Sequence, residues 1–212
     1  MNLAPYLAAT GLAKRFGRRV LFRDLGFDLA PGDGLAVCGA NGSGKSTLLQ
    51  IVAGVQSPSK GRVTLRLGEQ TVADEHRSRR VGFVAPYLHF YDAFTARENL
   101  TFIARARRLE ANGRIDTLLD RVGLGGRGDD FVRTYSSGMQ QRLRLAAALL
   151  PAPSVLLLDE PTATLDAAGR ALVADLAAAH RSEGGILVVA TNVEHEADWC
   201  DQTVEIGSAG VG

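Results

Sequence analysis

The chain of 212 residues contains few lysines, cysteines and aromatic side chains. Lys14, Lys45 and Lys60 are its only lysines, so most of its 24 basic residues are arginines. Cys38 and Cys200 stand far apart, and neither has a second cysteine at CxxC spacing. This spacing excludes a disulfide framework and a zinc site built on cysteine pairs. We therefore expect a reducing compartment and a packing role for both thiols.

The sequence also lacks a charge bias and a long apolar run. Its 24 basic and 23 acidic residues give a net charge of +1, so the composition does not indicate a nucleic-acid partner. No segment approaches the ~20 apolar residues of a membrane-spanning helix, and the first residues lack the pattern of a secretory signal. We expect no nucleic-acid partner and a chain that neither enters nor spans a membrane by itself.

The hydrophobic pattern indicates an α/β fold. The segment "RVTLRL" alternates as a half-exposed strand does, and the segments before it look similar. The runs "LAVCGA", "SVLLLDE" and "GILVVAT" are typical of strands covered on both faces in a parallel sheet. Helical spacing in between predicts a helical subdomain inserted at 86–150. Residues 1–85 and 151–212 would form the core and an N-terminal antiparallel β subdomain of one domain, and the final "GSAGVG" is expected to fray.

A glycine-rich loop stands between "LAVC" and the apolar-periodic "LLQIVAG". Its glycines allow backbone N–H groups to turn inward and bind phosphate together with the following helix N-terminus. Lys45 would reach the β- and γ-phosphates, and the Ser46 hydroxyl would ligate Mg²⁺. A plain glycine-rich turn is the alternative. The loop fits G-x-x-x-x-G-K-[ST] and its candidate nucleotide-binding residues are Gly39, Ala40, Asn41, Gly42, Ser43, Gly44, Lys45, Ser46 and Thr47.

A second apolar strand ends in Asp159 and Glu160. Ligands of an open parallel sheet bind beyond the carboxyl ends of its strands, so we expect this pair to face the phosphate loop. Asp159 is the expected Mg²⁺ partner, and Glu160 is the expected base that polarises a water for attack on the γ-phosphate. By itself the pair could be a solvated turn before Pro161. With the phosphate loop, it predicts a P-loop NTPase core that binds phosphate and Mg²⁺.

These motifs and the segment "YSSGMQQRLRLAAALL" resemble the ATP-binding subunits of ABC transporters over nearly the whole chain. The segment is similar to the signature loop LSGGQ and its helix: Ser136 and Gly138 match, whereas Ser137 and Met139 depart from the commonest residues. The residues themselves indicate a serine-capped helix N-terminus, which is an anion site. The resemblance implies that this loop closes over the nucleotide of a second copy in a head-to-tail dimer.

The resemblance assigns two further residues. Phe16, in "AKRFGRR", stands where an aromatic side chain stacks on adenine, although a core residue of a strand is the alternative. Asp166, in "TATLDAAGR", stands where an aspartate crosses the dimer interface. It also precedes a helix that it can cap, and both roles are compatible.

Two positions depart from the family pattern. Pro86 stands where a glutamine would sense metal and water, and Asn192 stands where a histidine would contact the γ-phosphate. An amide donates a hydrogen bond but brings no charge. We therefore expect a slow Mg²⁺-dependent ATPase, with Asn192 on the γ-phosphate and a water at Pro86. His195 is a conceivable substitute for the histidine, but we expect it to lie on the surface.

Aromatic residues crowd the segment "PYLHFYDAF" in a chain with only 6% aromatic residues. They either pack the helical subdomain against the core or form an exposed groove. The resemblance implies that membrane-spanning subunits dock near Pro86–Phe94. The chain would then lie on the cytoplasmic face of the cell membrane, held there by its partners. The aromatic side chains of this segment are Tyr87, Phe90, Tyr91 and Phe94.

The resemblance implies an ATP-hydrolysing transporter subunit that energises its membrane partners by ATP-driven dimer closure. Export is the expected direction, because the short chain without a C-terminal extension is similar to the ATPases of haem-exporter or cytochrome c maturation systems. One alternative is an ATP-gated binding module that does not hydrolyse ATP, against which Glu160 argues. Another is a soluble ABC ATPase outside transport, against which the lack of coiled-coil insertions and of a second cassette argues.

Overall fold

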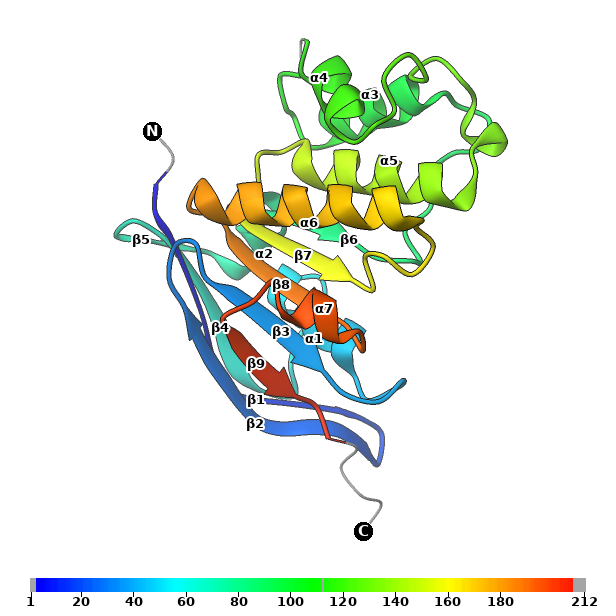
Figure 1. The fold of residues 1–212 in the computed structure, drawn as a ribbon. Coiled ribbons are helices and arrows are strands. Elements are labelled where there is room, and N and C mark those ends of the chain that lie inside the picture. Colours follow the sequence, from blue (N-terminus) through cyan, green and yellow to red (C-terminus); the bar gives the residue numbers. More distant parts are fainter. Residues whose placement is uncertain (1–2, 112, 208–212) are drawn as a thin grey trace.

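The computed structural model describes residues 3–111 and 113–207, which form two β-sheets and the helices that pack on them (Figure 1). One sheet is antiparallel, and in β4 Val63, Leu65 and Leu67 are buried while Arg66 is exposed, which confirms the predicted alternation. Its strands, in spatial order, are β2 (Arg19–Leu29), β1 (Pro5–Phe16), β4 (Lys60–Leu67) and β5 (Gln70–Val72).

The other sheet is parallel and contains the three apolar runs that the sequence predicts as covered strands. Every residue of its strands β7 and β8 is buried. The α/β fold class is therefore confirmed. The strands, in spatial order, are β6 (Val81–Val84), β7 (Val155–Asp159), β8 (Ile186–Ala190), β3 (Gly34–Cys38) and β9 (Gln202–Glu205).

Helices pack on both faces of the parallel sheet: α3 to α6 contribute to one hydrophobic core and α1 to the other. Helices α3 and α4 lie at the top of Figure 1, above α5 and α6. Helices α3 to α5 come between β6 and β7 in the chain, where the sequence predicts helices. The limits of that subdomain, 86–150, and the single domain 1–212 remain our proposal, and 208–212 of the tail expected to fray lie outside the described residues. The bounds are α1 (Lys45–Ala53), α2 (Asp74–Arg77), η1 (Ser78–Arg80), α3 (Ala96–Ala106), α4 (Arg114–Arg121), η2 (Val132–Thr134), α5 (Ser137–Leu149), α6 (Ala167–Ser182) and α7 (Glu194–Ala197).

The parallel sheet separates two hydrophobic cores. Because successive side chains of a strand point to opposite faces, neighbouring residues of β7 enter different cores. Leu156 and Leu158 pack with α3 to α6, whereas Leu157 packs with α1 and the antiparallel sheet. This arrangement fixes the strand ends, and with them the loops that follow β3, β7 and β8.

Candidate nucleotide site

The loop between β3 and α1 has a backbone that favours glycine. Gly39, Gly42 and Gly44 have φ values of 141°, 76° and 116°, all in the left-handed region. A Cβ atom on Gly39 would also collide with the carbonyl oxygen of Ile206, just after β9. The structure therefore requires the glycines that define the sequence motif.

Lys45 follows this loop as the first residue of α1 and is only 5% exposed. Its Nζ donates hydrogen bonds to the carbonyl oxygens of Gly39 (2.7 Å) and Ala40 (3.4 Å) and to Oδ1 of Asn192 (3.0 Å). The Oγ atom of Ser43 is buried and has no hydrogen-bond partner among the described residues. A buried ammonium held by neutral acceptors and a buried, unpartnered hydroxyl in the same loop fit a phosphate ligand.

Asn192 follows β8 and spans the loop. Its Oδ1 accepts from Lys45, and its Nδ2 donates to Oδ1 of Asn41 at 2.6 Å. The side chain therefore lies on the phosphate loop, as its predicted role requires, and its contact with a γ-phosphate stays a prediction. His195 is exposed on α7.

Asp159 and Glu160 occupy different environments although they are neighbours. Asp159 ends β7 and is 2% exposed. Burial raises the pKa of its carboxyl and the charge of Glu160 raises it further, while the Ser46 hydroxyl and the Lys45 charge act in the opposite direction. Glu160 is exposed and has a φ of 47°, a conformation that costs a non-glycine residue about 1–2 kcal/mol. Its N–H donates to the carbonyl of Ala190 at 2.9 Å, which ties it to β8.

A cavity of about 390 Å³ brings several of the predicted residues together, whereas Gly39, Ala40, Ser43, Asp159 and Asn192 do not line it. Phe16 lies at its edge and is 51% exposed, so the alternative of a strand core residue is wrong. Arg19 lines the cavity as well and donates to the carbonyl of Gly42 at 2.9 Å, a contact that the sequence pattern did not indicate. The lining residues are Phe16, Arg19, Leu21, Asn41, Gly42, Gly44, Lys45, Ser46, Thr47 and Glu160.

The signature segment and Asp166 are absent from the lining of this cavity. Ser136 caps α5 by accepting from the N–H of Met139 (3.2 Å), while Ser137 starts the helix and Gly138 follows it. Asp166 caps α6 by accepting from the N–H of Gly169 (2.7 Å), which confirms the capping role. Their predicted role at a second copy's nucleotide remains a prediction.

The aromatic segment combines both of the arrangements that the sequence left open. Phe90 packs against the core that includes α3 to α6. Tyr87, Tyr91 and Phe94 are 43%, 55% and 41% exposed, respectively. Tyr91 stacks in a tilted geometry on Phe94, with the ring centroids 5.3 Å apart. An exposed aromatic cluster therefore stands directly after β6.

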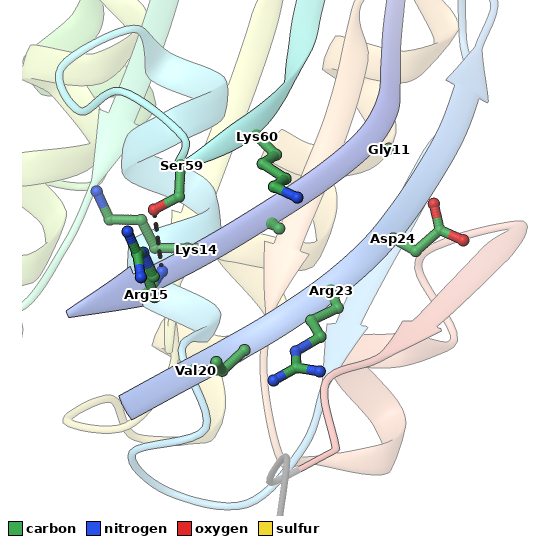
Figure 2. Close-up of a pocket in the computed structure, with 9 residues that line it drawn as sticks. Gly11, Lys14, Arg15, Val20, Arg23, Asp24, Ser59 and Lys60 are labelled. Carbon is green, nitrogen blue, oxygen red and sulfur yellow. Dashed lines mark hydrogen bonds between the residues drawn. The ribbon is translucent and has the colours of Figure 1, made fainter. Parts of the chain in front are cut away.

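A larger cavity, of about 600 Å³, is lined by residues of β1, β2 and the start of β4 (Figure 2). Arg15, Arg23 and Lys60 give it a basic lining, but all three side chains are exposed. Lys14 instead donates to the carbonyl of Ser57 at 2.8 Å. We place the site in the smaller cavity, because there a buried ammonium, a hydroxyl and a carboxylate converge.

Residues 22–163, more than half of the chain, match the family described as ABC transporter. The chain belongs to this family. ABC ATPase domains bind ATP with Mg²⁺ and generally hydrolyse ATP. An ATP-binding cassette solved as a dimer in a post-hydrolysis state, bound to ADP and Pi, has a TM-score of 0.79 at 22% identity, over 96% of this chain and 97% of that one. At this identity the likeness confirms the fold alone.

The chain is 36% identical over 207 residues to the uncharacterized ABC transporter ATP-binding protein YdbJ of Bacillus subtilis, covering 95% of this chain and 66% of that protein. It is 34% identical over 207 residues to Nod factor export ATP-binding protein I of Rhizobium leguminosarum bv. viciae, again covering 95% and 66%. It is 38% identical over 159 residues to the sulfate/thiosulfate import ATP-binding protein CysA of Thermosynechococcus vestitus, covering 74% and 47%. The chain thus spans about two thirds or less of these relatives.

These relatives identify an ATP-binding subunit of a transporter but not its direction. One is named for export and another for import, and none of the three is named for haem export or cytochrome c maturation. Within 3–111 and 113–207, no helix combines the length and the apolar character that a bilayer crossing needs.

Proposed function

We propose that the chain hydrolyses ATP with Glu160 as the base and Lys45 as the residue that holds the phosphates. The observation that supports this is the shared cavity: Glu160, Lys45 and Ser46 line it together. Asp159 lies at the end of the strand that leads into Glu160. The exposed carboxylate of Glu160 can accept a proton from water, while the buried ammonium of Lys45 can bind the phosphates, so different residues carry the two tasks.

The residues around the cavity have complementary roles. Lys45 would exchange its neutral acceptors for phosphate oxygens, and charge-assisted hydrogen bonds are roughly twice as strong as neutral ones. Phe16 offers an exposed ring for stacking on adenine at the cavity edge. Mg²⁺, when bound, neutralises phosphate charge, and the oxygens of Ser46 and Asp159 are the donors of the kind it prefers.

Two substitutions relative to the family pattern make the proposed enzyme slow. Loss of one transition-state donor typically lowers a rate ~10²–10³-fold, and the amide of Asn192 recovers only part of such a loss. Pro86 follows β6, beside β7, and has neither a polar side chain nor a backbone N–H. A water would have to fill its place.

Phosphate release by the purified chain, with ATP and Mg²⁺, tests this proposal. Glu160→Gln should abolish release, whereas Glu69→Gln, an identical change at an exposed loop position, should not. If wild type and Glu160→Gln released phosphate at the same background rate while ATP still bound, the protein would instead be an ATP-gated binding module. Pro86 and Asn192 are the residues that favour this second candidate.

We further propose that a helix of a membrane-spanning subunit docks on the exposed aromatic segment Pro86–Phe94. A hydrogen-bond path leads from there to the catalytic loop. Arg144 donates from Nε to the carbonyl of Leu88 (2.8 Å) and from a guanidinium N–H to Oε1 of Gln141 (3.0 Å). Gln141 donates in turn to the carbonyl of Pro161 (2.9 Å), next to Glu160.

A photo-crosslinker tests this docking surface. At Tyr91 it should capture a membrane-spanning protein from native membranes, and at Val55, which is exposed elsewhere, it should not. Equal capture at both positions, or capture of soluble proteins only, would contradict the proposal.

The remaining proposals concern assembly and direction. Ser136–Met139 and Asp166 lie outside the cavity of their own chain, which supports a head-to-tail homodimer or pseudo-dimer with two shared sites. Docking on membrane subunits would hold the chain at the cytoplasmic face of the membrane. We propose export as the direction, and a haem-exporter or cytochrome c maturation system as the type of transporter, on the resemblance of the sequence alone.

A further inference from the structure

Glu196, on α7, is a buried carboxylate that the sequence motifs do not explain. It is only 1% exposed. One of its oxygens accepts a hydrogen bond from the hydroxyl of Thr162, and the other accepts one from the hydroxyl of Thr191. Within 3–111 and 113–207, no basic side chain forms an ion pair with it. Burying a carboxylate without a cation is unfavourable, so the hydrogen bonds from the two hydroxyls are needed to offset the loss of hydration.

The two threonines belong to the two loops that carry the candidate catalytic side chains. Thr162 comes two residues after Glu160, beyond the end of β7, and Thr191 comes directly before Asn192, beyond the end of β8. The hydroxyl of Thr191 also accepts the N–H of Val193 at 2.9 Å. Glu196 therefore joins the loop of Glu160 to the loop of Asn192.

The loop after β7 needs such support because Glu160 has the unfavourable φ of 47°. Three consecutive residues are each held by a different element. The N–H of Glu160 donates to Ala190 of β8, the carbonyl of Pro161 accepts from Gln141 of α5, and Thr162 donates to Glu196 of α7. Of these three contacts, only the last involves a carboxylate, and it leads to the Asn192 loop.

We propose that Glu196 is a positioning residue for ATP hydrolysis, holding Glu160 and Asn192 in register through the hydroxyls of Thr162 and Thr191. This inference rests on the proposed function. Both threonines donate to Glu196, so a carboxylate, which offers two acceptors, satisfies them together. We call Glu196 and its hydrogen bonds to the hydroxyls of Thr162 and Thr191 the clamp. A glutamine of the same shape keeps one acceptor and replaces the other with a donor, so it breaks one of these hydrogen bonds without creating a cavity.

The test is the steady-state ATPase activity of Glu196→Gln, with ATP affinity and melting temperature measured in parallel. A lost hydrogen bond to a buried charge corresponds to a rate reduction of about 10-fold or more. We expect kcat to fall by that factor while KM and the Kd for ATP change less than about twofold, because the phosphate loop is not touched. Glu194→Gln is the matched control: the same change, on the same short helix, at an exposed residue.

A second variant, Thr162→Val, tests the proposal even if the Glu196→Gln protein does not fold. It removes one donor and keeps the side-chain volume, and it should lower kcat in the same way. The double variant should be no slower than the slower single variant, because both changes break the same clamp. Unchanged kcat in Glu196→Gln or in Thr162→Val, or independent losses in the double variant, would overturn the inference. A wild type without ATPase activity would instead overturn the proposed function.

Discussion

Asn192 offers a sensitive probe of the nucleotide site, because its Oδ1 lies 3.0 Å from Nζ of Lys45. The substitution Asn192→Asp changes little in shape but gives this contact a full negative charge. With an effective dielectric constant of about 20, two unit charges 3.0 Å apart attract by roughly 5 kcal/mol before their dehydration is counted. Hydrogen bonds to charged groups contribute about 1.5–3 kcal/mol net, and we take a strengthening of this size, well below the Coulomb attraction, for the change from an amide to a carboxylate.

ATP must compete for the same ammonium, so this strengthening opposes nucleotide binding. We expect Asn192→Asp to weaken the affinity for ATP by about 10-fold to 100-fold, since each 1.4 kcal/mol corresponds to a factor of ten. Repulsion between the new carboxylate and the phosphates acts in the same direction. Isothermal titration with ATP and Mg²⁺ measures the effect, and raising the salt concentration should reduce it.

Asn192→Ala is the matched control, because it frees Lys45 from a neutral contact without adding charge. Its affinity for ATP should stay within a few-fold of the wild-type value. If Asn192→Asp bound ATP as tightly as Asn192→Ala does, Lys45 would not be the residue that holds the phosphates, and the reasoning would be refuted.

Other predictions concern Lys45, Glu160 and the two cysteine thiols. Lys45→Ala should abolish ATP binding, whereas Lys60→Ala should not, and equal titration curves for the two would contradict the role of Lys45. Glu160→Gln should form a dimer with ATP and Mg²⁺, and light scattering that showed only monomers at high protein concentration would count against the shared sites. Burial raises the pKa of the Cys200 thiol to about 12 and also raises that of Cys38. Both thiols should therefore stay protonated at pH 8 and react slowly with iodoacetamide, with faster alkylation as the pH rises, and rapid alkylation of the folded protein at pH 8, seen by mass spectrometry, would disagree.

The sequence predicts the parts of the site that depend on local pattern. An apolar strand, a glycine loop and an amphipathic helix are contiguous, so their geometry follows from a few neighbouring residues. Lys45 and Asp159 could be placed for that reason, because Lys45 directly follows the glycine-rich loop and Asp159 ends a predicted strand. Ser136 and Asp166 could be identified as helix caps on the same basis, and both cap helices in the structure.

The contacts that the sequence did not indicate join residues far apart in the chain. Arg19 reaches Gly42 across 23 positions, and Gln141 reaches Pro161 across 20. The segment "VEHEAD" is mostly polar and looks like a solvated surface, yet Glu194 is exposed while Glu196 is buried. Which of two glutamates faces inward depends on how the loop after β8 folds, and no periodicity in a four-residue helix reveals it.

The loop after β8 divides its tasks between two neighbouring residues. Thr191 is buried, donates its N–H to the carbonyl of Val37 (3.1 Å) and binds Glu196 through its hydroxyl. Asn192 is exposed, and its side chain hydrogen-bonds to Asn41 and Lys45 at the phosphate loop. The backbone is therefore fixed by a residue that does not reach the nucleotide, which allows an asparagine to stand where the family pattern has histidine without a change in the fold.

This division predicts that substitutions of the two residues differ in their effect on stability. Thr191→Val removes buried hydrogen bonds worth about 1–3 kcal/mol, and each kcal/mol lowers the melting temperature of a domain of this size by about 2–4 °C. Asn192→Ala should leave the melting temperature almost unchanged and lower the rate of phosphate release. A thermal melt in which Asn192→Ala destabilised the protein as much as Thr191→Val would show that Asn192 is part of the scaffold, and its departure from the family pattern would then need a structural explanation in place of a chemical one.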